Sequence, residues 1–169
     1  MRGGAGIIHT ARKTLIITFI SVVILDLLTK ALITGGLREG QAVEIVPGFL
    51  NIVYYMNPGA AFGLFNEGGF MRRAFLVGTS VAALVVIGVL LRSAKGFLTS
   101  FGLSLVAAGA VGNLIDRVRF GTVVDFIDLH IGGYHWPAFN VADSAITVGV
   151  ILAVFSYYFK DASKNCSFS

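Results

Sequence analysis

Four long apolar runs dominate the pattern of hydrophobic and polar positions along the chain. They cover about residues 14–32, 74–91, 97–115 and 141–159, and each contains 18 or 19 residues. A helix rises 1.5 Å per residue, so about 20 residues cross a hydrocarbon layer about 30 Å thick. The pattern therefore predicts four transmembrane helices.

The segments between the runs have a different pattern. Residues 35–69 begin with a Gly35-Gly36 pair, which is expected to end the first helix. They include a β-branched and aromatic stretch at 44–55, with a turn at Pro47-Gly48. The loop at about 116–140 contains two strand-like pieces, at 123–129 and 134–139. The expected fold is an all-α polytopic membrane protein: four transmembrane helices with a small extracytoplasmic β-rich cradle, in a single membrane domain covering residues 1–169.

The composition supports membrane insertion and argues against a soluble domain or a nucleic-acid-binding protein. Charged residues make up 13% of the chain and hydrophobic residues 56%, whereas soluble domains carry about 25% charged residues. The sequence pI is near 9.5, but the basic residues are scattered at the ends of segments, so nucleic-acid binding is not expected. The single cysteine, Cys166, cannot form an internal disulfide and is expected to be an inert free thiol in a polar tail.

The distribution of charge predicts the orientation. Four spans put both termini on one side, which carries seven basic residues and one acidic residue, a net charge of +6. The other side carries six basic and eight acidic residues, a net charge of −2. The basic counts alone are nearly balanced. The asymmetry and the short basic N-terminus favour cytoplasmic termini and outward-facing loops.

Polar side chains gather near the outer ends of the spans. Asp26 and Lys30 are four residues apart and share a helix face. They predict an ion pair with Lys30 reaching to the interface, or else a pair that shapes a polar site. Asn113, Asp116 and Arg117 also share a face. One interpretation is that Asp116 and Arg117 form a surface pair while Asn113 hydrogen-bonds a neighbouring helix. A second interpretation, compatible with the first, is that Arg117 and Asn113 bind a substrate's backbone or head group.

The fourth run begins with a capping signal. Asn140 is a favourable N-cap, and Asp143 three residues later is typical of a capping box. An acidic residue in the first turn is also favoured by the helix dipole, so this pattern alone does not require catalysis.

Asp125 is expected to lie in an environment that disfavours its charge. Strand alternation places Asp125 beside Val123 and Ile127, which is unfavourable for a solvated charge. A buried acid needs a partner, and a second carboxylate that shares a proton is one solution. Asp128 is expected to point the other way and to be solvated.

The two histidines do not indicate a metal site. His130 and His135 flank a Gly-Gly turn, match no zinc-binding spacing and are accompanied by no cysteine cluster. We expect them to be loop residues, and we expect no metal and no cofactor.

Five motifs in order resemble the bacterial lipoprotein signal peptidase (signal peptidase II) family. The resemblance extends from Thr14 to about Phe159. The motifs are D-L-L-T-K at 26–30, N-P-G-A-A-F-G at 57–63, G-N-L-I-D-R at 112–117, V-V-D-F at 123–126 and F-N-V-A-D at 139–143.

The resemblance implies an aspartic endopeptidase of the bacterial inner membrane. Such enzymes cleave prolipoproteins just before a cysteine that carries diacylglycerol, and they need no metal. By position, the catalytic residues fall on Asp125 and Asp143. The candidate substrate-binding or supporting residues are Asp26, Lys30, Asn57, Gly59, Asn113, Asp116, Arg117 and Asn140. The expected partners are prolipoproteins and membrane lipids, and the expected state is a monomer.

Two other classes stay open on the residues alone. Acidic residues in membrane segments also mark ion-coupled transporters, although here the acids lie at helix ends and no internal repeat is visible. A non-catalytic scaffold would not need the paired acids Asp125 and Asp143.

Within the pair of Asp125 and Asp143, the helix N-terminus favours charge on Asp143, whereas desolvation raises the pKa of Asp125. Asp125 is therefore expected to hold the shared proton.

Overall fold

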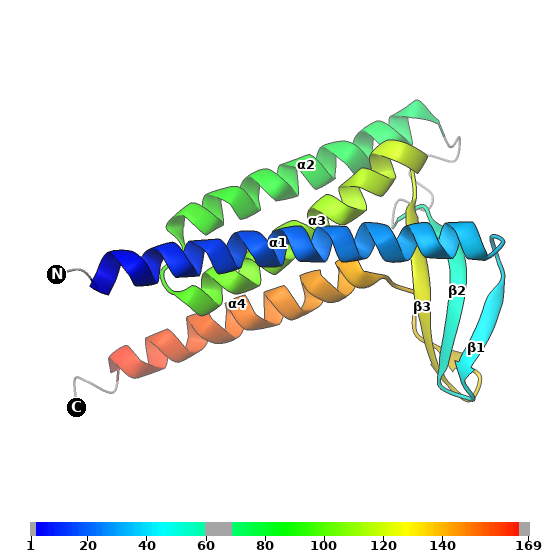
Figure 1. Cartoon of the computed structure of the whole chain (residues 1–169). Helices are drawn as coiled ribbons and strands as arrows, with labels where there is room; N and C mark the ends of the chain where they lie inside the picture. The colour runs from blue at the N-terminus through cyan, green and yellow to red at the C-terminus, as the bar shows by residue number, and fades with distance from the viewer. Residues whose placement is uncertain (1–2, 60–68, 166–169) are drawn as a thin grey trace.

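Four long helices form a bundle, and a small sheet lies at one end of it (Figure 1). The computed structural model describes residues 3–59 and 69–165, so Cys166 lies outside the described residues. The helices are α1 (Gly3–Gly36), α2 (Phe70–Ser93), α3 (Phe97–Phe120) and α4 (Val141–Asn165). Each contains a stretch of at least 18 residues that is long and apolar enough to cross a membrane. The prediction of four membrane-spanning helices is confirmed.

The helices extend beyond the predicted apolar runs at one or both ends, most of all α1, which begins at Gly3. α1 ends at Gly36, as the Gly35-Gly36 pair indicated. α3 continues to Phe120, five residues beyond the predicted end of its apolar run, and Gly121 caps it in a left-handed conformation (φ +75°). The predicted loop therefore begins later than residue 116, because the charged residues of that stretch form the last turns of a helix.

Small residues let α3 and α4 approach closely. A Cβ atom added at Gly102 would lie 2.5 Å from the carbonyl oxygen of Gly149. One added at Gly109 would overlap the carbonyl oxygen of Ala142 and lie 2.8 Å from Ile146. Close backbone contact of this kind is how helices pack in lipid, where no hydrophobic effect drives them together. The packing places the start of α4 directly against α3.

The sheet is antiparallel, with strands in the order β1-β2-β3-β4. β1 (Ala42–Val46) and β2 (Leu50–Asn57) form a hairpin, and Gly48 in its turn has φ +72°. β3 (Val123–Ile131) pairs with β2, so the segment after α1 meets the segment after α3. β4 has only two residues (Tyr134–His135), and Phe139 further along forms an isolated bridge to Ile127.

The strands run across the direction of the helices, and the sheet lies at the end of the bundle opposite to the start of α1 and the end of α4 (Figure 1). The bridge at Phe139 anchors the chain to β3 immediately before α4 begins at Val141. The sheet therefore positions β3 over the first turn of α4, and the candidate polar residues meet there.

Candidate active site

One asparagine links the two aspartates predicted to be catalytic. The side-chain amide of Asn140 donates to Asp125 Oδ1 over 2.7 Å, and its carbonyl oxygen accepts from the backbone N–H of Asp143 over 2.9 Å. The backbone N–H of Asn140 in turn donates to Asp143 Oδ2 over 3.3 Å. The predicted capping box is thus confirmed, and the residue that begins α4 also contacts β3.

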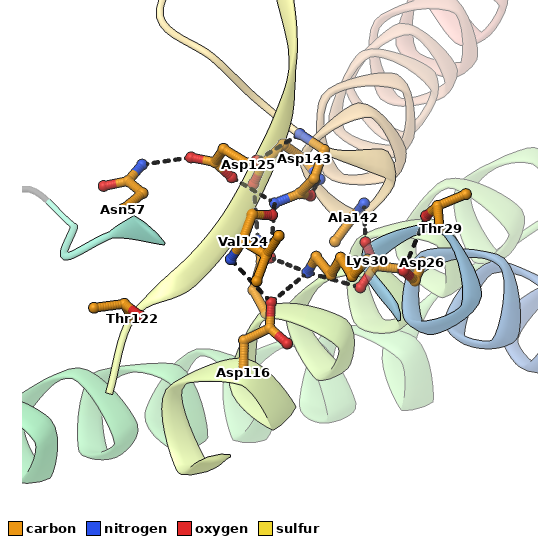
Figure 2. A network of polar contacts seen from close by, with 12 residues as sticks. Asp26, Thr29, Lys30, Asn57, Asp116, Thr122, Val124, Asp125, Ala142 and Asp143 are labelled. Atoms are coloured by element: carbon orange, nitrogen blue, oxygen red, sulfur yellow. Dashed lines mark hydrogen bonds and ion pairs between the residues drawn. The ribbon is translucent and has the colours of Figure 1, made fainter. Parts of the chain in front are cut away.

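Asp125 is almost completely buried, with 2% of its surface exposed. The side chain of Asn57 donates to its Oδ2 over 2.7 Å, and Asn57 is itself held by the backbone N–H of Gly59 (2.8 Å) (Figure 2). Gly59 has φ +77°, a conformation that glycine adopts without strain. The remainder of the 57–63 motif lies outside the described residues.

Burial raises the pKa of the Asp125 carboxyl to about 6, and the neighbouring charge of Asp143 adds to the effect. The amides of Asn57 and Asn140, and the charge of Lys30, act in the opposite direction because they stabilise the carboxylate. Desolvation outweighs them. An acid in this state holds its proton at higher pH than an ordinary aspartate does.

Lys30 lies at the centre of a buried cluster beneath the two aspartates. Its ammonium is 2.8 Å from Asp26 Oδ2, 2.9 Å from Asp116 Oδ2 and 3.1 Å from Asn113 Oδ1 (Figure 2). The predicted ion pair of Asp26 with Lys30 is confirmed, but Lys30 does not extend to the interface: only 4% of it is exposed. The carboxylates of two helices hold it inside the bundle instead.

The two carboxylates of this cluster also bind backbone. Asp26 Oδ1 accepts from the N–H of Ala142 (2.9 Å), in the first turn of α4, and Asp116 Oδ2 accepts from the N–H of Val124 (3.2 Å), in β3. Gly112 makes room for Asp26, because a Cβ at that position would overlap the Asp26 carboxylate. The cluster therefore fixes α4 and β3 relative to α1 and α3.

Lys30 also determines which way the Asn113 amide faces. An ammonium group only donates hydrogen bonds, so the atom of Asn113 that faces Lys30 must be the carbonyl oxygen. The NH₂ group then points to Asp143 and donates to its Oδ1 over 2.8 Å. The prediction that Asn113 binds a neighbouring helix is confirmed, and the partner is Asp143 of α4.

Arg117 does not form the surface pair with Asp116 that was one interpretation of the sequence. Asp116 is paired with Lys30, and Arg117 donates to Ser80 Oγ in α2 over 3.2 Å. The guanidinium is half-buried, and the charges of Asp143, Asp116 and Asp125 act on it. Sequence reasoning missed Ser80, because a serine within an apolar helix gives no signal of its own.

Asp128 is not solvated, contrary to expectation. It is 7% exposed and accepts from Asn51 (2.9 Å), its partner across β2 and β3, and from His135 Nδ1 (2.9 Å). Burial opposes ionisation, but the hydrogen bonds from His135 and Asn51 outweigh it and lower the pKa of Asp128. Sequence reasoning missed Asn51 because only the strand register reveals it.

The two histidines are strand residues of a tight hairpin and not loop residues. His130 of β3 is paired with His135 of β4, and their rings stack with centroids 4.8 Å apart. Within residues 3–59 and 69–165, no group of three or more His, Cys, Asp or Glu side chains is arranged to hold a metal ion. The polar site consists of carboxylates, amides and one ammonium.

A family model described as "Signal peptidase (SPase) II" matches residues 18–159, most of the chain. The chain belongs to the signal peptidase II family. It is 47% identical over 141 residues to a lipoprotein signal peptidase of Desulforapulum autotrophicum, covering 82% of this chain and 87% of that protein. It is 39% identical over 160 residues to one of Syntrophus aciditrophicus, covering 91% and 99% of the two chains.

Solved structures agree with this signal peptidase II assignment. Two solved structures, each described as a bacterial membrane enzyme determined by the in meso method, at 1.9 and 2.3 Å resolution, are both 38% identical to the chain. The first superposes with a TM-score of 0.76 over 86% of this chain and 92% of that chain, and the second with 0.77 over 90% and 91%. The chain is thus a multi-pass membrane peptidase, and the family decides against the transporter and the scaffold.

Proposed function

We propose that this chain is an aspartic endopeptidase that removes signal peptides from diacylglyceryl-modified prolipoproteins, cutting just before the modified cysteine. The similarity to lipoprotein signal peptidases supports the substrate class. The observation that carries the mechanism is the bridge of Asn140 between Asp125 and Asp143. The side chain of Asn140 binds the Asp125 carboxyl and the backbone of Asp143, and the backbone N–H of Asn140 binds the Asp143 carboxyl. One residue thus contacts both acids, one from a strand and one from a helix.

The environments of the two acids favour different protonation states. Asp125 is buried and its pKa is raised to about 6, which suits a carboxyl that donates a proton. Asp143 lies in the first turn of α4 and receives hydrogen bonds from Asn113 and from the backbone of Asn140, which suits a carboxylate that accepts one. We therefore assign Asp143 as the general base and Asp125 as the general acid.

The reaction needs only these two groups and water. Asp143 takes a proton from a water molecule while the oxygen of that water attacks the carbonyl carbon of the scissile bond. Asp125 gives its proton to the carbonyl oxygen, which yields a neutral tetrahedral diol. Collapse of the diol returns a hydroxyl proton to Asp125, while Asp143 passes its proton to the leaving nitrogen and the carbon–nitrogen bond breaks. Both acids end in their starting states.

The other polar residues act by positioning. Lys30 and Asn113 orient Asp143, Asn57 orients Asp125, and Asp26 holds the first turn of α4 through the N–H of Ala142. Arg117 is half-buried among carboxylates, and we assign its remaining N–H groups to the substrate's backbone or head group. A site at the helix ends lies where a lipid-anchored peptide and water meet.

The test uses the full chain in proteoliposomes with a diacylglyceryl-modified prolipoprotein. Mass spectrometry of the products is expected to find a mature fragment that starts at the modified cysteine, and the activity is expected to persist in a metal chelator. The same precursor without the lipid is the control and should be cleaved far more slowly. Cleavage at another peptide bond, or complete loss of activity in chelator, would overturn the proposal.

We also propose that both termini are cytoplasmic and that the site opens at the outer face of the bacterial inner membrane. The charge distribution supports this orientation, since seven basic residues and one acid lie on the side of the termini. Reporter fusions after Lys95 and Lys164 should report the cytoplasm, and one after Gly133 the outside. A cytoplasmic signal from the fusion at Gly133 would contradict the orientation.

A further inference from the structure

The hairpin of β3 and β4 has one polar and one apolar side. Ile131 pairs with Tyr134 and His130 with His135, and paired residues point to the same side of a sheet. Alternation then assigns the neighbours of these pairs. One side carries Asp128, His130 and His135. The other carries Leu129, Ile131, Tyr134 and Trp136.

No part of the chain that the structure describes covers the apolar side. Tyr134 is 85% exposed, Ile131 77% and Trp136 67%. Together with Phe49, Leu129 and the edge of His130 they line a shallow groove of about 270 Å³. Residues 129–137 contain no Lys, Arg, Asp or Glu. Strands exposed to water are usually protected by such charges, and large exposed apolar patches mark contact surfaces. The composition of the hairpin is that of a surface which does not face water.

The position of the hairpin identifies what covers it. The strands cross the end of the bundle, and the hairpin ends project sideways past the first turn of α4 (Figure 1). On α4, Val148, Ile151 and Val154 are about half exposed, as expected for residues that face lipid. The hairpin therefore overhangs the lipid that surrounds α4. Tryptophan and tyrosine are the residues that concentrate at the boundary between lipid and water.

We propose that the apolar side of the β3–β4 hairpin docks into the head-group layer of the leaflet beside α4, with Tyr134 and Trp136 as its anchors. The lipid-facing surface of α4 and the docked hairpin then form one continuous membrane contact. Docking would hold the end of β3 near Ile131 at a fixed height over the bilayer. The same strand carries Asp125. The claim concerns lipid contact only and does not depend on the proposed chemistry.

Trp136 is the only tryptophan in the chain, so its fluorescence tests the claim directly. The full chain is placed in phosphatidylcholine vesicles in which part of the lipid carries a nitroxide, either on the head group or deep in the acyl chain. We expect head-group and shallow nitroxides to remove most of the Trp136 emission and deep nitroxides to remove less. We also expect aqueous acrylamide to quench Trp136 much less than free tryptophan.

A matched variant moves the tryptophan to the opposite side. His135→Trp combined with Trp136→Phe should show the reverse pattern, with strong acrylamide quenching and weak lipid quenching, and far-UV circular dichroism verifies its fold. Strong acrylamide quenching of Trp136 in the wild type, without lipid quenching, would overturn the proposal. Protection of Trp136 that disappears when the protein is diluted into excess unlabelled lipid would identify a second copy as the occupant, and would overturn it as well.

Discussion

The stability of the Asp125→Asn variant, compared with that of the wild type at the same pH, should increase as the pH rises. The pKa of Asp125 is raised from an ordinary value of 3.8 to about 6 by burial and by Asp143. A carboxyl group with a raised pKa stabilises the folded state fully below the unfolded value, and this contribution is lost as the pH rises through the folded value. Each tenfold change in proton affinity corresponds to about 1.4 kcal/mol, so the pH-dependent part is about 3 kcal/mol.

The substitution also has a cost that does not depend on pH. Both oxygens of Asp125 accept an amide N–H, one from Asn57 and one from Asn140. Asparagine offers only one oxygen, so one of these donors faces an NH₂ group, at a cost of about 1–3 kcal/mol. The absolute stability of the variant therefore combines two effects of opposite sign at neutral pH, and the change with pH isolates the first.

The measurement is thermal unfolding of the wild type and of Asp125→Asn in the same detergent, from about pH 4 to pH 8. About 3 kcal/mol corresponds to a change of about 6–12 °C in the difference between the two Tm values over this range. Asp128→Asn is the matched control, because the pKa of Asp128 is lowered and the difference should change in the opposite direction. A Tm difference that stays constant, or that has the same sign of slope for both variants, would refute the reasoning.

Three further substitutions test the framework of the site. Lys30→Met leaves two carboxylates buried without their cation and should cost about 3–5 kcal/mol in thermal unfolding; an unchanged Tm would contradict the cluster. Gly109→Ala should cost about 1–3 kcal/mol or more by separating α3 from α4, whereas Gly88→Ala, with open space around it, should be neutral. Arg117→Lys should raise KM more than it lowers kcat, because the planar donor fork is lost; unchanged kinetics would refute that assignment.

The local features of this fold could be predicted from the sequence. Apolar run length gives the four spans, because the thickness of a bilayer fixes how many residues a helix needs. The capping box of Asn140 and Asp143 follows from three-residue spacing, and the pairing of Asp26 with Lys30 follows from four-residue spacing.

Two of the errors concern contacts between distant segments. Whether Asp128 is solvated depends on the register that places Asn51 opposite to it, and no local pattern encodes that register. Lys30 was expected at the interface because its partner in α3, Asp116, lies 86 residues away in the chain and was assigned to Arg117. Non-local packing decided each case.

The most direct test of the aspartic mechanism compares cleavage of lipid-modified prolipoprotein by three variants. In each variant one carboxyl group is replaced by an amide of nearly the same size. Asp125→Asn and Asp143→Asn should each insert into the membrane normally and lose activity by at least about 100-fold, since each removes a proton-transfer group. Asp128→Asn, the other buried acid of β3, should cleave at close to the wild-type rate. Near wild-type cleavage by either Asp125→Asn or Asp143→Asn would contradict the dyad.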